Sequence, residues 1–384
     1  MVSDPPLRHT PLEAVHERLG ARFTAFAGWR LPVRYGSELA EHHAVRRAAG
    51  VFDLSHMAEL AVEGAAAAVV VDATLVGSFA ELAIGRARYS LCCDEGGGVV
   101  DDVVVYRTAT DRFLVVANAG NRQPVAEALE AAAVGRPAAV VDRTDELALV
   151  AVQGPRAAEV VGRLATPAAA ARVGGLAGYG CAEVELAGVP ALVGRTGYTG
   201  EDGFECFVAA PAGAALFEAV LAAGRDDGVV PAGLAARDSL RLEAGMALYG
   251  NELSRDVHPD EAGLGRLVRL DKPAAFPGRP ALERRLADPA GPRRRLVGLA
   301  GNGRRAGRHG YAVVAADRPD QPVGRVTSGA LSPTLGRPIA MAYVEAGQAA
   351  PGTQLAIDVR GDRAEVEVTP LPFYRRRGGD GAQR

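Results

Sequence analysis

Two adjacent acids, Asp101 and Asp102, follow a run of three glycines and two valines at residues 96–100. Carboxylates placed in this way are candidates for acid–base or electrostatic chemistry. The pattern puts a flexible turn directly before a strand, and neighbouring side chains on a strand point to opposite faces. The two acids therefore cannot share one task. One can face a pocket while the other faces solvent or caps the turn, but a hairpin whose acids solvate the bend is the simpler interpretation of this stretch alone.

A second candidate carboxylate is Glu205, which lies between Phe204 and Cys206 just after a segment with three glycines at residues 197–203. Glycines allow a tight bend and a close approach of a ligand to the backbone. A carboxylate between apolar neighbours is expensive to bury without partners. It can accept two parallel hydrogen bonds, which suits a ligand with an N–H beside an amino group. A solvated hairpin is the alternative.

Two arginines, Arg237 and Arg241, are four residues apart in the segment 233–245, where leucines predict a core-facing helix. The two guanidinium groups lie on one face of that helix. Without other information, an exposed arginine stripe near Asp238 and Glu243 is the favoured interpretation of this face. A fourth segment, residues 326–336, is polar and rich in turn residues, and we interpret it as structural because it holds no nucleophile with an evident base.

Motifs of several common enzyme classes are absent from the sequence. It has no P-loop and no GxSxG, and its glycine run lacks the GxGxxG order, so no dinucleotide site is predicted. It also has no HExxH and no Cys/His cluster, so no metal is predicted. His56 follows a serine within a strand-like stretch and is interpreted as a satisfied structural histidine. The cysteines are predicted to be reduced and structural; they are Cys92, Cys93, Cys181 and Cys206.

The elements that must position these residues alternate between helix-like and strand-like segments, which predicts an α+β fold. The expected helices are residues 10–20 (with Thr10 as N-cap), 37–49, 65–76, 123–133, 156–164, 212–223 and 234–243. Strands are expected at residues 51–62 with a break at 55–56, and at 88–91, 99–107, 112–117, 146–152 and 194–208. Six short segments after residue 287 predict a small β-barrel or jelly-roll-like unit. We expect one region at 1–285, a barrel domain at 286–384, and a mobile charged tail from residue 375.

Composition limits the remaining function classes. The chain has 384 residues, 48% of them hydrophobic and 23% charged, which is typical of a globular protein of two or three units. A net charge of −3 provides no strong attraction to nucleic acid or to an anionic membrane. The first eleven residues lack the apolar stretch of a secretory signal, and no apolar run is long enough to span a bilayer. A cytoplasmic protein is expected.

Taken together and in this order, the motifs resemble the aminomethyltransferase family, the T-proteins of the glycine cleavage system. The resemblance covers about residues 10–373. Its matching stretches are residues 10–12 (TPL), 26–29 (FAGW), 35–37 (YGS), 41–46 (EHHAVR), 50–57 (GVFDLSHM), 87–90 (ARYS), 96–102 (GGGVVDD), 152–155 (VQGP), 196–205 (TGYTGEDGFE), 233–245 (GLAARDSLRLEAG), 248–253 (LYGNEL), 259–265 (PDEAGLG), 326–336 (VTSGALSPTLG) and 372–373 (PF).

The resemblance implies a three-lobed, cloverleaf-like fold around a folate cavity, with a β-barrel as its last lobe. It implies that the chain acts in glycine catabolism as a tetrahydrofolate-dependent aminomethyltransferase. The donor would be the aminomethyl group on the dihydrolipoyl arm of the H-protein, which makes lipoylated H-protein the expected partner. Tetrahydrofolate, as co-substrate, would accept the methylene carbon, and ammonia would be released.

The resemblance also carries site residues over, one position at a time. It implies that Asp101 is the catalytic acid, near the folate nitrogens that form the new bonds. It implies that Glu205 binds the N–H and amino group of the pterin and that Arg237 pairs with a glutamyl carboxylate at the far end of the folate. The remaining implied folate-binding positions are Tyr198, Tyr89, Asn118, Met57 and Leu54.

The sequence departs from the family pattern at a few positions. Arg266 stands where the family usually has an aromatic residue, Pro280 replaces the glutamate of an FxGRE motif, and the run 375–377 is unusually basic. The same fold also hosts folate-dependent demethylases of small methylated donors, which is the main alternative. A remote alternative is a non-enzymatic folate-binding protein of iron–sulfur assembly, but the cysteine of that group is absent from residues 247–252 and Asp101 is kept.

Overall fold

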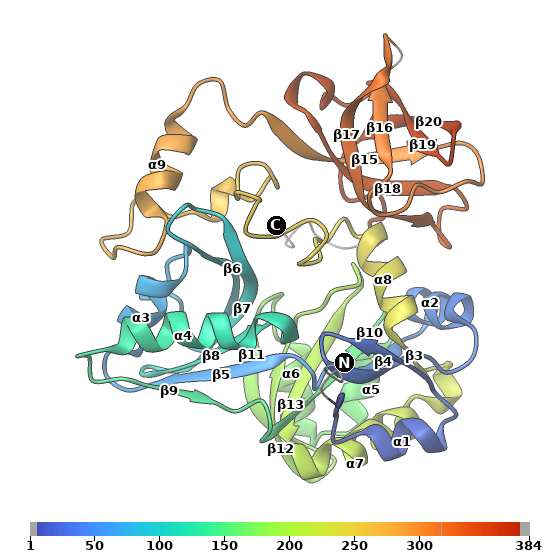
Figure 1. The fold of residues 1–384 in the computed structure, drawn as a ribbon. Helices are drawn as coiled ribbons and strands as arrows, with labels where there is room; N and C mark the ends of the chain where they lie inside the picture. The colour runs from blue at the N-terminus through green and yellow to red at the C-terminus, as the bar shows by residue number, and fades with distance from the viewer. Residues whose placement is uncertain (1–5, 316, 377–384) are drawn as a thin grey trace.

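The computed structural model describes residues 6–315 and 317–376 and has three lobes. Two lobes are β-sheets covered by helices, and the third is a closed β-barrel (Figure 1). The mixed helix and sheet class, the three-lobed arrangement and the C-terminal barrel that the sequence predicted are therefore confirmed.

The first lobe is a six-stranded sheet with helices on its outer face. Its strands, in spatial order, are β11 (Cys181–Leu186), β12 (Val189–Gly194), β13 (Gly203–Ala209), β10 (Leu147–Gln153), β4 (Gly50–Asp53) and β14 (Val230–Pro231). The outer helices are α1 (Glu13–Arg18), α5 (Ala157–Arg163), α6 (Pro167–Gly174) and α7 (Ala210–Ala223). In β4, Val51 packs under these helices while Phe52 faces the opposite way, so this strand is buried on both faces.

The second lobe is a five-stranded sheet that carries the two adjacent acids. Its order is β6 (Arg86–Cys93), β7 (Val99–Ala109), β8 (Arg112–Ala117), β5 (Ala58–Glu63) and β9 (Ala139–Asp142). Helices α3 (Ala67–Thr74) and α4 (Arg122–Ala133) cover one face of this sheet. Its other face packs against the inner face of the first sheet through Phe52, Tyr106, Leu114 and Leu149. The acids on β7 thus lie next to the seam between the two sheets.

Two helices lie between these lobes and the barrel, and a small sheet packs on one of them. The sheet has the order β1 (Arg8–His9), β3 (Trp29–Arg34) and β2 (Arg22–Phe26). Helix α2 (Glu38–Arg47) packs on α8 (Leu234–Glu243), and α8 also contacts the barrel, as Figure 1 shows. Short 3₁₀ helices span Ala119–Asn121, Arg225–Asp227, Gly265–Leu267 and Ala346–Gln348.

The barrel closes in the order β15 (Arg294–Gly301), β18 (Pro338–Glu345), β17 (Arg318–Leu331), β16 (Ala312–Ala315), β19 (Gln354–Val359) and β20 (Asp362–Thr369). Each predicted short segment after residue 287 overlaps one of these strands. Helix α9 (Arg279–Ala287) precedes the barrel. We propose the division into residues 1–285 and 286–384 on this basis. Of the predicted mobile tail, residues 377–384 lie outside the described residues.

Some local predictions were wrong for identifiable reasons. The first helix begins at Glu13 with Leu12 at its N-cap, because the hydroxyl of Thr10 donates to the buried carboxylate of Asp53 at 2.6 Å instead of capping the helix. The expected long strand at 194–208 divides into β12 and β13, with the glycine-rich loop between them.

A buried polar seam fixes α2 and α8 to the barrel. Glu243 at the end of α8 is fully buried and accepts from the backbone N–H of Thr334 at 2.9 Å and its hydroxyl at 2.7 Å, and from the Ser332 hydroxyl. Arg46 donates to the same carboxylate at 2.8 Å, and His42 lies 3.3 Å from it. The segment 326–336 is thus the barrel's contribution to this seam, in agreement with its structural interpretation.

Acid is expected to weaken this seam. Burial raises the pKa of Glu243, but the hydrogen bond and charge of His42, the Ser332 hydroxyl and the charge of Arg46 outweigh it and lower the pKa to about 2. Because the folded-state pKa is below the ordinary 4.5, the stabilisation is complete above about pH 4.5 and is lost as the pH falls toward 2. Urea unfolding at pH 6 and pH 3 should show the stability difference between wild type and Glu243→Gln shrinking at the lower pH. A difference that is equal at both pH values would contradict this assignment.

The single lysine of the chain, Lys272, closes the C-terminal end of α3. Its ammonium is buried and donates to the carbonyl oxygens of Asp72 at 2.7 Å and Gly77 at 2.6 Å, and to that of Leu75. An ammonium has three donors, so it binds one carbonyl in the last turn of α3, one at its C-cap and one beyond the helix. Its Nζ also lies 4.4 Å from the centre of the Phe276 ring.

Replacing Lys272 with methionine is expected to lower the free energy of unfolding by about 2 kcal/mol, because the buried carbonyls lose their donor while the aliphatic stem is kept. Urea denaturation measures this. The matched control is Arg269→Met, since Arg269 is an exposed cation paired with Asp271, and it should change stability by less than about 0.5 kcal/mol. Equal losses for the two variants would mean that Lys272 contributes no more than a surface cation.

Candidate active site

A large cavity of about 1710 Å³ lies where the lobes meet. Its wall is formed by the inner faces of the two sheets, α8, the segment after α8, and the barrel strands β15 and β20 with the segment that follows. It is lined by most of the residues that the family resemblance implied. They are Leu54, Met57, Tyr89, Asn118, Tyr198, Glu205 and Arg237.

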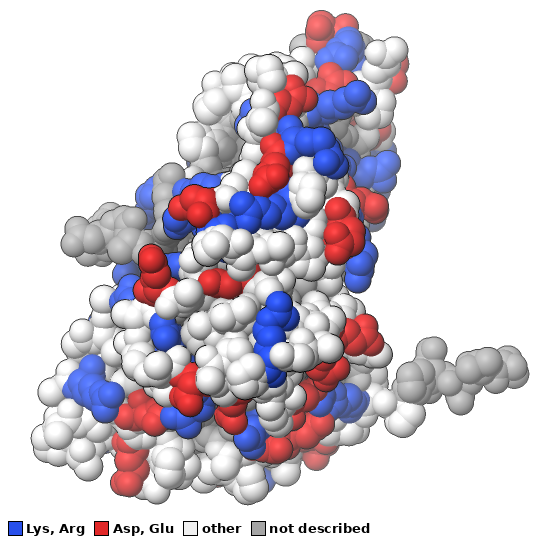
Figure 2. Space-filling model, turned by 90° about the vertical axis from the view of Figure 1, so that its left-hand side faces the viewer, with Lys and Arg blue, Asp and Glu red and all other residues white. Residues whose placement is uncertain are grey.

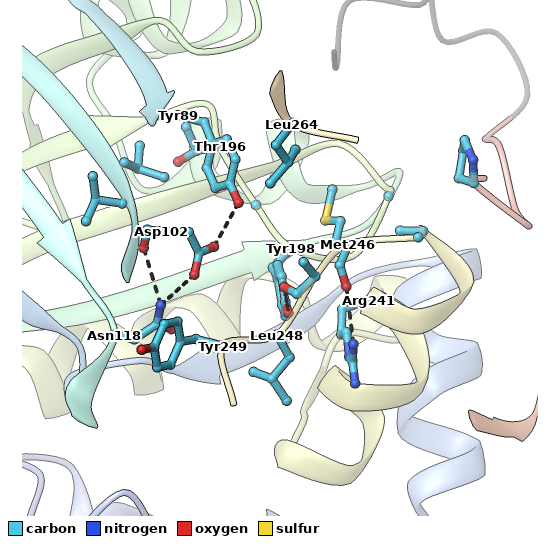
Figure 3. A pocket seen from close by; sticks show the side chains of 18 of the residues that line it. Tyr89, Asp102, Asn118, Thr196, Tyr198, Arg241, Met246, Leu248, Tyr249 and Leu264 are labelled. Carbon is cyan, nitrogen blue, oxygen red and sulfur yellow. Dashed lines mark hydrogen bonds between the residues drawn. The ribbon is translucent and has the colours of Figure 1, made fainter. Parts of the chain in front are cut away.

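Asp102 is the acid of the pair that faces the cavity. Its two carboxylate oxygens are held separately, one by the side-chain amide of Asn118 at 2.9 Å and the other by the hydroxyl of Tyr89 at 3.0 Å (Figure 3). The three side chains come from three neighbouring strands or their ends, β6, β7 and β8. A carboxylate fixed in this way is oriented without being neutralised by a cation.

Asp101, which the resemblance implied as the catalytic acid, does not line the cavity. It is fully buried behind the cavity wall. Its carboxylate accepts from the backbone N–H of Asn118 at 2.9 Å, from the Asn118 side chain at 2.8 Å, and from the Asn121 side chain at 2.6 Å. The expectation that the two acids separate onto opposite faces agrees with the structure, but neither of them solvates a bend.

The shared amide of Asn118 couples the two acids electrostatically. Its two N–H groups donate to one oxygen of each carboxylate. Burial and then the charge of Asp102 raise the pKa of Asp101, and burial raises the pKa of Asp102 against the hydrogen bonds from Tyr89 and Asn118. A raised pKa makes a carboxylate a stronger base than usual, which suits proton transfer near neutral pH.

Glu205 forms the second acidic point of the cavity. Its Oε2 accepts from the Tyr106 hydroxyl at 2.9 Å and from the Thr196 hydroxyl. No described side chain donates to Oε1, so this oxygen is available to a ligand. The glycines before Glu205 serve packing as well. A Cβ at Gly197 would lie 2.0 Å from the side-chain amide of Gln153. Glycine is therefore needed there for packing against the protein itself, and not for the approach of a ligand.

Arg237 lies beside the same part of the cavity as Glu205. Its guanidinium carbon is 4.5 Å from the centre of the Tyr198 ring, a cation–π arrangement. Burial lowers the pKa of Arg237, while Tyr198 and Glu205 act in the opposite direction, so these groups are within electrostatic reach of one another. Arg237 is therefore next to the predicted pterin wall rather than at a separate far end. Arg241, by contrast, is bound to Glu252 at 2.8 Å and has a structural role.

The cavity wall is rich in cations although the chain is slightly acidic. The lining arginines are Arg86, Arg88, Arg237, Arg241, Arg266, Arg269, Arg375 and Arg376, against the acids Asp102, Glu205 and Asp238. Among the described residues, five of these arginines make no ion pair with a carboxylate; they are Arg86, Arg88, Arg237, Arg266 and Arg375. The outer face in Figure 2 carries acidic and basic side chains interspersed. The cavity is therefore suited to an anionic ligand.

Sequence reasoning missed three residues of this site. Asp102 was weighed only as the neighbour of Asp101. Tyr106 was interpreted as a sheet residue, and nothing in its sequence context indicates that its hydroxyl reaches Glu205. His56, interpreted as a satisfied structural histidine, lines the cavity, and its Nδ1 has no hydrogen-bond partner among the described residues.

The described residues contain no group of three or more His, Cys, Asp or Glu side chains that could hold a metal ion, and none of their helices is long and apolar enough to cross a membrane. The cysteines are buried and free, as the sequence predicted.

Comparison with known proteins covers nearly the whole chain. Residues 12–272 match the model of the GCVT N-terminal domain, and residues 294–375 match that of the glycine cleavage T-protein C-terminal barrel domain. Proteins named aminomethyltransferase from Streptomyces avermitilis and Cutibacterium acnes are each 51% identical; the alignments cover 98% and 96% of this chain and 100% and 99% of theirs. The crystal structure of the glycine cleavage system aminomethyltransferase T from Bartonella henselae matches with a TM-score of 0.87 and 38% identity, covering 96% of this chain and 98% of that one.

Proposed function

The chain belongs to the aminomethyltransferase family of glycine cleavage T-proteins, and from this premise we propose that its cavity binds tetrahydrofolate and receives the aminomethyl-dihydrolipoyl arm of H-protein. The methylene carbon is transferred to the folate, and ammonia and the dihydrolipoyl arm are released. The observation that carries the proposal is one anion-attracting cavity holding two oriented carboxylates, Asp102 and Glu205.

Glu205 and Arg237 are proposed to recognise the pterin ring. A pterin presents an amino group, a ring N–H and a carbonyl oxygen in sequence along one edge. The free Oε1 of Glu205 and its neighbouring oxygen suit the two donors, and the unpaired guanidinium of Arg237 suits the carbonyl. This revises the glutamyl-carboxylate role expected for Arg237, because its guanidinium lies over Tyr198. Leu54, Met57, Tyr89 and Tyr198 supply the apolar and aromatic wall.

Asp102 is proposed as the catalytic acid in place of Asp101. During transfer the carbon carries positive charge, and a fixed carboxylate facing it stabilises that charge without reorganising. The two folate nitrogens that bind the carbon each lose a hydrogen; one ends on the departing ammonia and one on the sulfur. Asp102, whose pKa is raised by burial, is placed to move such a proton. Asp101 acts as a positioning residue, since it holds Asn118, which in turn holds Asp102.

The test is release of ammonia from aminomethylated lipoyl H-protein, measured with and without tetrahydrofolate. Strong folate-dependent release supports the proposal. Binding of tetrahydrofolate without any release would mean that the donor is a different molecule, such as a small methylated amine, and failure to bind tetrahydrofolate would overturn the assignment of the cavity.

A further inference from the structure

His56 lies at the corner where the chain passes from the first sheet to the second. Strand β4 ends at Asp53 and β5 begins at Ala58, and the residues between them line the cavity at three positions, Leu54, His56 and Met57. The side chain of His56 is 3% exposed, and its Nδ1 is fully buried with no hydrogen-bond partner among the described residues. An unpartnered buried polar atom costs about 1–3 kcal/mol, so its presence calls for a reason.

The neighbours of His56 do not supply that reason. The ring of Phe26 meets the imidazole edge-on at a centroid distance of 5.9 Å and offers no acceptor. The nearby carboxylate of Asp53 is already occupied by the Thr10 hydroxyl at 2.6 Å, by His16 at 2.8 Å and by the backbone N–H of Ser55 at 2.9 Å. His56 is therefore not part of an acid–histidine pair within the protein.

The imidazole is neutral in this environment. Burial and then the positive charge of Arg237 lower the pKa of His56 to about 4. A neutral imidazole offers one donor and one acceptor, and which nitrogen donates is decided by the partner it meets. Arg237 also lines the cavity and lacks a carboxylate partner among the described residues. His56 and Arg237 thus line the same cavity, and neither side chain has a hydrogen-bond partner among the described residues.

We propose that His56 binds the pterin ring of the folate beside Arg237, an inference that rests on the proposed function. Besides the edge assigned to Glu205 and Arg237, a tetrahydropterin presents ring nitrogens that donate or accept hydrogen bonds, which a neutral imidazole can match. The glutamyl tail is recognised mainly by its anionic carboxylates, and a neutral histidine adds no charge to that of the cavity's arginines in attracting them. The guanidinium of Arg237, whose charge reaches His56, lies over the ring of Tyr198.

The test compares two ligands on wild type, His56→Phe and His56→Gln, by titration calorimetry without oxygen. One ligand is tetrahydrofolate, and the other is 6-methyltetrahydropterin, which lacks the benzoyl-glutamyl tail. His56→Phe is expected to weaken both ligands about tenfold, the effect of one buried hydrogen bond and the pterin group it leaves unpaired. Its thermal midpoint should stay unchanged or rise, because the unpartnered nitrogen is gone. Glutamine keeps a donor and an acceptor and should retain most of the affinity.

The control is His309→Phe, a barrel histidine bound to the carbonyl of Thr327 at 2.8 Å and outside the cavity wall, which should leave both affinities unchanged. Wild-type affinity of His56→Phe for both ligands would overturn the inference and leave the proposed function standing. A loss confined to tetrahydrofolate would place His56 at the tail and would also overturn it. If wild type itself bound neither ligand, the proposed function would fail first.

Discussion

Replacing Asp102 with asparagine is expected to lower folate-dependent ammonia release by roughly a thousandfold, the loss seen when a fixed group that stabilises transition-state charge is removed. The amide has nearly the shape of the carboxylate. Its oxygen can still accept from Asn118, and its amino group can donate to the oxygen of Tyr89. The Tyr89 hydroxyl then accepts at this contact, whereas it donates in wild type. The site should therefore keep its geometry and lose only the negative charge, and the effect should appear in kcat.

The matched variant is Asp101→Asn, which changes the neighbouring acid in the same way. Asp101 accepts three hydrogen bonds, and an amide would direct one N–H against one of these donors. This variant should lose stability and should reduce activity indirectly, by displacing Asn118. Single-turnover ammonia release and urea denaturation, measured on both variants, separate the two roles. If Asp101→Asn abolished release at unchanged stability while Asp102→Asn stayed active, Asp101 would be the catalytic acid after all.

The placement of these two acids, with Asp102 and not Asp101 lining the cavity, marks the limit of what the sequence could predict here. Strand alternation required the two side chains to point in opposite directions. It could not say which one faces the cavity, because the pairing of β6 with β7 shifts register between Cys92 and Cys93, directly opposite the start of the acidic strand. Counting residues along the strand from the glycine turn therefore does not tell which acid faces the cavity. A bulge that only the tertiary structure reveals decides it.

The barrel and the helix α8 were predicted well because their signals are local. Short strands separated by Gly, Asp and Pro, and leucines at helical spacing, depend on residues close in sequence. The errors concern partners distant in sequence. Thr10 binds Asp53, 43 residues away, and Tyr106 reaches Glu205, 99 residues away. The same holds for His56, whose lack of a partner is a property of the assembled cavity.

Replacing Glu205 with glutamine is expected to weaken tetrahydrofolate binding by roughly a hundred- to a thousandfold, while the fold is kept. The hydroxyls of Tyr106 and Thr196 both donate to one oxygen of Glu205, and the carbonyl oxygen of glutamine can accept both. Its amino group must then face the ligand. A pterin presents an N–H and an amino group at this point, so two sets of donors meet without an acceptor. Buried polar groups left unpaired in this way give large discrimination.

The control for this variant is Asp202→Asn, which removes a carboxylate from the same loop. Asp202 is bound to Arg195 at 2.6 Å outside the cavity wall, so its loss should change folate affinity little. Titration with tetrahydrofolate and thermal unfolding of the two variants provide the comparison. Near wild-type affinity of Glu205→Gln would mean that the pterin is not recognised by Glu205. Because the hydroxyl donors of Tyr106 and Thr196 fix which oxygen is free, that result would also place the donor edge of the ligand elsewhere in the cavity, where Asp102 and Asp238 are the other lining acids.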